Sequence, residues 1–144
     1  MTNLNLKGIM TNKELLDSLK NAVNCDMKQK LIQNSQELII GQANRKTMLR
    51  MLEYELDEET KIDGKSVETL KCMFEDYLDK YMADKPQGHI FIVICCLFST
   101  FIVKEPMHPQ HASNWQRIGE NEYRCPYYDD ALNSLCNWCV CEKL

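Results

Sequence analysis

The feature that most constrains the fold is an apolar run of 14 residues, Ile90 to Val103, in which only Ser99 and Thr100 are polar. A membrane-spanning helix needs about 20 apolar residues, whereas runs of about 10–14 are more typical of buried core helices. The β-branched and aromatic content would also suit a buried strand, but the run is longer than a usual strand and lacks evident partner strands. We therefore expect a buried central helix that ends at Pro106 and Pro109.

Amphipathic segments upstream of this run provide helices that can surround it. The first begins at a capping box, Thr11 to Glu14, in which the hydroxyl and the carboxylate each satisfy a free backbone amide. It is expected to end near Asn24 or Asp26, either of which can cap the next helix. The second spans Met27 to Leu56. Its apolar stripe fades between Gly41 and Lys46, where we expect a break, since an interior glycine costs about 1 kcal/mol relative to alanine.

A further amphipathic helix is expected to begin at Ser66, a suitable cap, after a turn at Asp63-Gly64. One face of this segment carries its apolar side chains, Val67, Leu70, Phe74, Tyr77, Leu78 and Tyr81, and the charged side chains fall elsewhere. Lys85 to Gly88 reads as a loop. These patterns predict an all-α fold, a helical bundle around a buried apolar helix.

The length of 144 residues indicates a single domain, which can bury a core without disulfides. The net charge is −4, and residues 1–65 hold ten basic and ten acidic side chains, so no basic stripe supports nucleic-acid binding. The N-terminal segment has no apolar signal-peptide core. We therefore expect a cytoplasmic protein without membrane association, whose eight cysteines serve as metal ligands or buried thiols.

A cysteine cluster near the C-terminus is the candidate functional site. Cys136 and Cys139 form a CxxC, a spacing that lets two sulfurs reach one tetrahedral ion from a tight turn. Cys125 lies upstream, Cys141 follows closely, and His108 lies at the edge of the same segment. Because this segment has few apolar anchors, a structural zinc ion would supply the folding free energy that it otherwise lacks.

The fourth ligand is open between His108 and Cys141. Three cysteines and one histidine suit a single zinc ion, whereas an all-cysteine set completed by Cys141 would favour an iron–sulfur cluster more strongly. The other interpretations of these cysteines are an internal disulfide and thiols that bind no metal. A thioredoxin-type redox pair is disfavoured because that motif needs a βαβ context.

Other reactive side chains have simpler explanations. Four cysteines read as ordinary thiols, Cys95 and Cys96 in the core, Cys72 beside an apolar stripe and Cys25 at a helix junction. His89 is expected to cap or pack rather than ligate, and His111 ranks below His108 as a ligand. Three aromatic side chains are expected to shield the metal, namely Tyr127, Tyr128 and Trp138. The chain contains no nucleophile-elbow, phosphate-loop or HExxH motif.

The C-terminal half also resembles a family of small uncharacterised archaeal proteins found in methanogens. The resemblance is carried by the segments Phe101–Pro109, Glu122–Pro126, Ala131-Leu132 and Leu135–Cys139, and covers about residues 70–144. It implies an archaeal, strictly anaerobic source, an all-helical body, and His108, Cys125, Cys136 and Cys139 as the ligand set.

We therefore expect a helical body over residues 1–105 and a small irregular metal-binding lobe over residues 106–144. The expected function is a structural zinc site in a non-catalytic interaction or regulatory protein that binds a protein partner. An iron–sulfur protein in electron transfer or redox sensing is the first alternative. A zinc-dependent enzyme, which would keep one coordination position for water, is the second.

Overall fold

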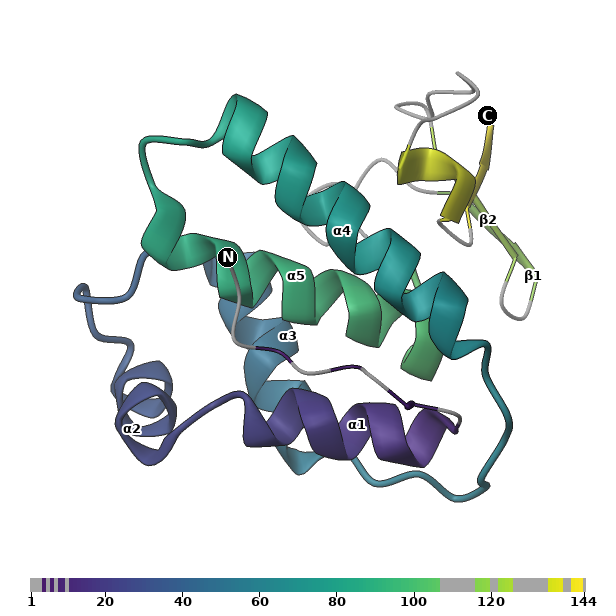
Figure 1. The fold of residues 1–144 in the computed structure, drawn as a ribbon, viewed down its shortest axis with the longest axis horizontal. Helices are drawn as coiled ribbons and strands as arrows, with labels where there is room; N and C mark the ends of the chain where they lie inside the picture. The colour runs from purple at the N-terminus through teal and green to yellow at the C-terminus, as the bar shows by residue number, and fades with distance from the viewer. Residues whose placement is uncertain are drawn as a thin grey trace.

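A computed structural model of the chain describes residues 4, 6, 8, 9, 11–106, 116–119, 122–125, 135–138 and 141–143. Beyond residue 106 this description covers the backbone and the side chains of Leu135 and Trp138. The described part is mostly helical, as the sequence predicts, with a small sheet near the C-terminus (Figure 1). The helical elements are α1 (Asn12–Asn21), α2 (Cys25–Gln33), α3 (Gln42–Glu53), α4 (Gly64–Tyr81), η1 (Pro86–Gly88), α5 (His89–Leu97), η2 (Phe98–Val103) and η4 (Leu135–Trp138). The strands are β1 (Gln116–Gly119), β2 (Glu122–Cys125) and β3 (Cys141–Lys143).

The apolar run forms the centre of the helical body as two consecutive segments, α5 and η2. Helices α4 and α3 both pack against α5, and α1 contacts η2, so the run is enclosed on several sides (Figure 1). Every α5 residue except Ile90 and Ile92 is buried. The stretch Pro86–Val103 is long and apolar enough to cross a membrane, yet 67% of it is buried inside the protein. The prediction of a buried central helix is confirmed.

The second half of the run, η2, is a π-helix, in which each backbone hydrogen bond spans five residues rather than four. It ends at Lys104, which adopts a left-handed conformation with φ 53°. The amides of Lys104 and Glu105 both donate to the carbonyl of Ser99, and Pro106 follows where no helix can continue. Among the described side chains, the Thr100 hydroxyl is buried without a hydrogen-bond partner. The run thus stays helical to its end, with a wider last turn than a regular α-helix.

The break between α2 and α3 lies earlier than the sequence predicts. The chain is non-helical from Asn34 to Gly41, whereas the segment from Gly41 to Lys46 was expected to contain the break. Asn34 ends α2 in a left-handed conformation with φ 54°, a role that asparagine shares with glycine. Gly41 caps α3 rather than interrupting a helix. Within the segment where the apolar stripe fades, Arg45 turns toward the end of α2 and its Nε donates to the Leu31 carbonyl at 2.8 Å.

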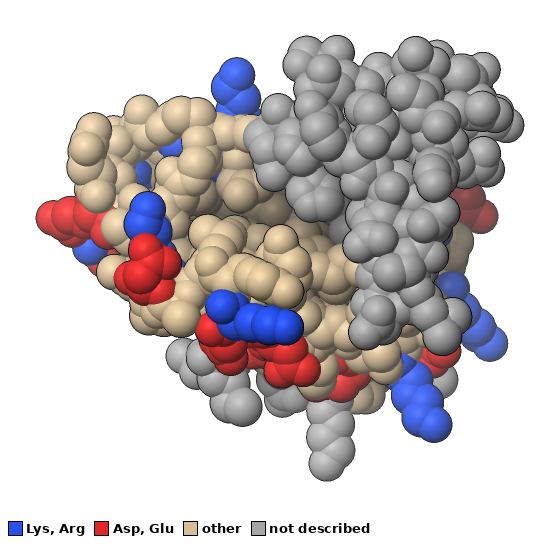
Figure 2. Space-filling model, turned by 90° about the horizontal axis from the view of Figure 1, so that it is seen from above, with Lys and Arg blue, Asp and Glu red and all other residues tan. Residues whose placement is uncertain are grey.

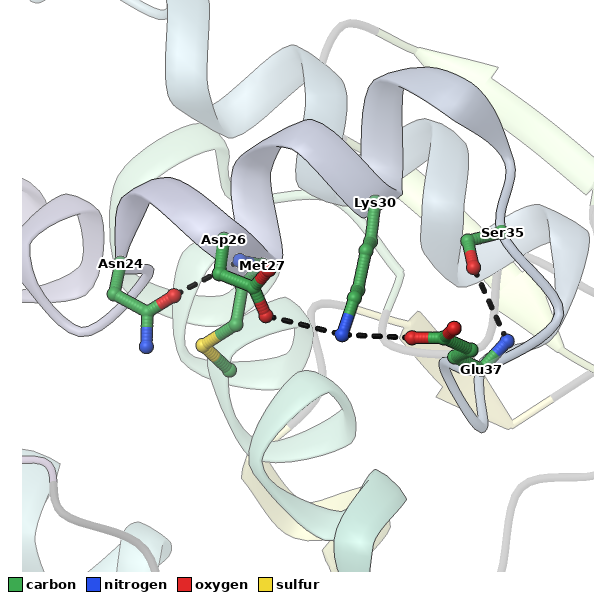
Figure 3. Close-up of polar contacts among 6 residues, drawn as sticks. All are labelled: Asn24, Asp26, Met27, Lys30, Ser35 and Glu37. Atoms are coloured by element: carbon green, nitrogen blue, oxygen red, sulfur yellow. Dashed lines mark hydrogen bonds and ion pairs between the residues drawn. The ribbon is translucent and has the colours of Figure 1, made fainter.

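The turn after α2 is held by ion pairs around Lys30 (Figure 3). Its ammonium lies 3.0 Å from the Asp26 carboxylate and 2.8 Å from that of Glu37. The pKa of Lys30 is raised, mainly by its hydrogen bond to Glu37 and secondly by its hydrogen bond to Asp26. Beside this network the Ser35 hydroxyl accepts from the Glu37 amide, and Asn24 caps α2 as the sequence suggests. Because exposed pairs contribute little stability, the network mainly fixes the direction of the turn.

Helix α4 begins at Gly64, and its cap lies three residues before Ser66, the cap that the sequence predicts. Asp63 is the actual cap, since its carboxylate accepts from the Lys65 amide and from the Ser66 hydroxyl, each at 3.0 Å. A carboxylate at this position satisfies a free amide and also complements the positive end of the helix dipole. The pair expected to form a separate turn therefore starts the helix.

A cluster around Arg50 joins α3 to the chain that leaves η2. Its guanidinium donates to both carboxylate oxygens of Glu105, at 2.9 and 2.7 Å. The same group lies 5.8 Å from the ring centroid of Tyr54 and 5.9 Å from that of Phe98. These two rings meet edge to face at 5.3 Å. The cluster fixes where the chain departs from the body toward the C-terminal elements.

The C-terminal sheet has the order β1-β2-β3, with β1 and β2 antiparallel and β2 and β3 parallel. The turn-forming residues Gly119, Glu120 and Asn121 allow a short hairpin in the sequence, and the antiparallel pair agrees with it. The parallel strand was not expected from the sequence. The sequence also allows one helical turn over Asp129 to Leu135, of which the structure describes only Leu135, where η4 begins.

Gly64 provides a test of the packing between α4 and the N-terminal segment. A Cβ at this position would collide with the backbone carbonyl of Ile9, whereas a Cβ at Gly41 would meet nothing within 4 Å. We expect Gly64→Ala to lower the free energy of unfolding by about 1–3 kcal/mol, since backbone cannot yield as a flexible side chain does. Gly41→Ala should change it by no more than about 1 kcal/mol. Urea unfolding of both variants measures this, and equal effects would contradict the packing.

Asn12 provides a second test, because its buried side chain ties α1 to the loop before α4. Its amide donates to the Glu58 carbonyl at 3.1 Å and its oxygen accepts from the Thr60 amide at 2.9 Å. Asn12→Ala leaves both groups unpaired, so we expect a loss of about 2 kcal/mol in the free energy of unfolding. The matched control is Asn24→Ala, which removes an exposed cap and should cost about 1 kcal/mol. An Asn12 variant no less stable than this control would contradict the role.

Candidate metal centre

Three of the proposed ligands lie on described elements of the C-terminal segment. Cys125 is the last residue of β2, Cys136 is the second residue of η4, and Cys141 is the first residue of β3. His108 and Cys139 lie outside the described residues, as do His111, Tyr127 and Tyr128. The described backbone therefore includes three of the proposed ligand positions, and each of them lies on a different element.

The parallel pairing of β2 and β3 brings two of these positions close together in register. Tyr123 pairs with Cys141, and Cys125 pairs with Lys143, so the two cysteines are two register positions apart on neighbouring strands. Positions alternate between the two faces of a strand, and register partners share a face, so positions two apart belong to the same face of the sheet. Parallel strands need a crossover connection, and η4 lies within this one, between β2 and β3 in the chain.

Helix η4 connects these positions to the helical body. It contacts α4, and its two described side chains, Leu135 and Trp138, are half-buried against the hydrophobic core (Figure 1). Cys136 follows the first of these anchors and Cys139 follows the second. Apolar contact therefore holds η4, on which Cys136 lies, against the body. Whether Trp138 also shields a metal from water stays a prediction.

The cysteines of the helical body behave as the sequence indicates. Cys95 and Cys96 are buried in the core, and burial raises the pKa of the Cys95 thiol to about 12. Such a thiol stays protonated and unreactive at neutral pH. Cys25 and Cys72 are exposed free thiols. The pKa of Cys72 is raised, mainly by partial desolvation and secondly by the negative charge of Glu68. None of these four joins a metal-binding group among the described side chains.

His89 packs rather than ligates, as the sequence predicts. Its ring is 6% exposed, and its Nε2 lies 2.8 Å from the Met82 carbonyl. Because a carbonyl can only accept, Nε2 carries the proton of this hydrogen bond. Nδ1 lies 3.6 Å from the Asp79 carboxylate. His89 thus fastens the start of α5 to the end of α4.

Two features of α4 differ from the sequence-based expectation. Tyr77 and Tyr81, expected on the buried face, are 47% and 62% exposed. Lys71 and Glu75, expected at the surface, have side chains only 12% and 14% exposed and pair at 3.4 Å. Periodicity alone places these residues near the edge of the apolar stripe, so it could not decide which edge is covered.

The N-terminal segment contributes to the core in a way that periodicity did not reveal. Leu4, Leu6 and Ile9 are buried, and Thr11 bridges to Lys61. A cavity of about 650 Å³ lies between this segment and the first turns of α4. The alternation of Leu4 and Leu6 was the available signal, but it is too short to predict burial.

The described surface shows mixed charge. On the face seen in Figure 2, basic and acidic side chains are interspersed, and the described residues of this face form no continuous basic stripe. Among the described side chains, no group of three or more His, Cys, Asp or Glu residues could hold a metal ion. The candidate centre therefore depends on the C-terminal cysteines.

Comparisons with known proteins identify relatives of the chain. A segment of 94 residues, 61% of this chain, is 32% identical to the UPF0305 protein MJ0646 of Methanocaldococcus jannaschii. The match spans 56% of the length of that relative. No solved structure matches the chain. The archaeal family that the sequence resembles is confirmed, while its cysteine and histidine signature stays a prediction. Because the family model matches residues 1–144, the chain belongs to the family described as "Uncharacterized protein conserved in archaea (DUF2115)".

Proposed function

We propose that this protein is a cytoplasmic metal-binding protein with a structural zinc site and no catalytic role of its own. Cys125, Cys136 and Cys139 would hold the ion, with His108 or Cys141 as the fourth ligand. The observation that carries the proposal is the parallel pairing of β2 with β3, because it brings the backbones of two cysteine-bearing strands together beside η4. Soft thiolate ligands in a tetrahedral set are those that structural zinc prefers.

Thermodynamics supports a structural role. The described strands have only three or four residues each, and small sheets of this kind are marginally stable alone. Two half-buried side chains on η4 provide apolar contact with the body. A bound ion adds folding free energy that a segment with so few anchors needs. The site would thus hold a surface lobe in one shape for a protein partner.

An iron–sulfur cluster is the second candidate, and the presence of four cysteines in this segment favours it. Thiolates from four cysteines can hold such a cluster in place of one zinc ion. Anaerobically purified protein distinguishes the two. A brown sample whose visible absorption bleaches on reduction identifies a cluster, whereas a colourless sample with about one zinc per chain supports the proposal.

Removal of zinc should affect the C-terminal lobe far more than the helical body. Both tryptophans, Trp115 and Trp138, lie in residues 106–144, so tryptophan emission reports on the lobe, and far-ultraviolet circular dichroism reports on the helices. We expect a strong zinc chelator to shift the emission to the red while most helical signal persists, because the ion stabilises the lobe. Re-addition of zinc should reverse the shift. Less than about half an equivalent of bound metal in a folded sample would contradict the proposal.

Thiol alkylation should divide seven of the eight cysteines into three groups, while Cys141 should join the third group only if it is the fourth ligand. We expect Cys25 and Cys72 to react in the folded protein because both are exposed. Cys95 and Cys96 should react only on denaturation, because both are buried. Cys125, Cys136 and Cys139 should react only after chelation, because a metal-bound thiolate is a poor nucleophile. Mass spectrometry of digests measures this, and full labelling of the last group before chelation would contradict the zinc site.

A further inference from the structure

We propose that Cys141, rather than His108, is the fourth ligand, so that the site is closed by four cysteines. This inference rests on the proposed function, since it presumes that the segment binds a metal. Its basis is the register of β2 and β3, which juxtaposes Cys125 and Cys141 on adjacent parallel strands. In the sequence these cysteines are 16 residues apart, and nothing in their spacing indicates that they pair.

The expected separation of the two positions suits a shared ion. Adjacent strands lie about 4.8 Å apart and rise about 3.3 Å per residue, so positions offset by two are about 8 Å apart between Cα atoms. Disulfides span Cα distances up to about 6.8 Å with sulfurs about 2 Å apart. Two thiolates on a tetrahedral zinc are about 3.8 Å apart, given Zn–S distances of about 2.3 Å, which extends that reach to about 8–9 Å. A zinc bridge therefore fits where a disulfide would not.

The order of the ligands along the chain supports the same set. The crossover from β2 passes through η4, which carries Cys136, and the chain enters β3 at Cys141. Cys139 lies between these two, with one residue separating it from Cys141. Three cysteines thus lie within six residues of chain, and the last of them lies on the strand that pairs with the strand of the fourth, Cys125. His108 precedes β1 and lies outside the described residues, so the register of β2 and β3 supports Cys141 alone of the two candidates.

The charge pattern of the strands is compatible with four thiolates. A zinc ion with four thiolates has a net charge of −2, one unit more negative than a site with three thiolates and a neutral histidine. Lys143 is the register partner of Cys125, and Arg124 precedes that cysteine. Glu142 pairs in register with Arg124. A lysine at the register position opposite a ligand favours its thiolate form.

A closed four-thiolate site leaves no coordination position for water. Catalytic zinc keeps such a position open, whereas structural zinc fills all four with protein ligands. Cys141 as a ligand thus argues against the zinc-enzyme alternative. It also fastens β3 to β2 through the metal as well as through the backbone ladder.

X-ray absorption at the zinc edge tests the ligand set directly. We expect the wild-type protein to show four sulfur neighbours at about 2.3 Å, and no nitrogen shell at about 2.0–2.1 Å. His108→Gln should leave this spectrum unchanged. Cys141→His should keep zinc but replace one sulfur with one nitrogen, which guards against a Cys141→Ser variant that merely fails to fold. Cys72→Ser, which removes an exposed thiol on α4, is the matched control and should have no effect.

The outcomes separate this inference from the proposed function. A wild-type nitrogen shell that His108→Gln abolishes would overturn the assignment of Cys141 and leave the zinc site standing. A nitrogen or oxygen shell that survives His108→Gln would overturn it as well, because it implies another fourth ligand. Wild-type protein without zinc would overturn the proposed function itself. Four sulfur neighbours that become three in Cys141→His would support both.

Discussion

The burial of α5 and η2 is the constraint on which the rest of the body depends. A helix that is apolar on nearly every side must be covered on nearly every side, and α1, α3 and α4 provide that cover with their own apolar faces. Polar contacts then fix how the covering elements meet. Asn12 joins α1 to the loop before α4, and Arg50 joins α3 to the chain beyond η2. These contacts set direction, while apolar burial supplies most of the driving force.

The C-terminal lobe differs from the body in the interactions that can stabilise it. Its described strands are short, and its apolar connection to the body consists of Leu135 and Trp138 on η4. Under the proposed function, a metal ion would add to the stability that these described apolar contacts give the lobe. The two parts of the chain would then unfold by separate routes, one governed by apolar surface and one by ligand exchange.

The sequence predicts much of the body because each helix has its signal, a cap or an apolar stripe, within its own segment. Thr11 caps α1 as expected, since its hydroxyl accepts from the Glu14 amide at 3.1 Å. The other half of the capping box differs, because the Glu14 carboxylate accepts from the Thr11 hydroxyl at 3.2 Å. Errors arise where distant contacts decide. Gly41 is a cap rather than a break because Arg45 reaches the end of α2, and Gly64 starts a helix because Asp63 outcompetes Ser66 as the cap. Local periodicity contains none of this information.

The sequence nominates the ligands of the candidate site, but it does not indicate how the strands that carry them are arranged. Residue type and spacing single out the cysteines, because few other roles explain a CxxC with two further cysteines nearby. The parallel register of β2 and β3 could not be anticipated from strands of three or four residues. Similarly, the burial of Lys71 depends on what covers one edge of α4, which a helical wheel does not specify.

The π-helical turn at η2 has a consequence for how this chain tolerates changes in length. A π-turn holds one more residue than the α-turn that it replaces, and each helical residue rotates the chain by about 100°. Loss of one residue between Phe98 and Val103 would be absorbed by closing this turn to α-helical width, whereas loss of one residue within α5 would rotate Glu105 by about 100° away from Arg50. The direction in which the chain leaves the body is thus encoded by a count of residues, not only by their chemistry.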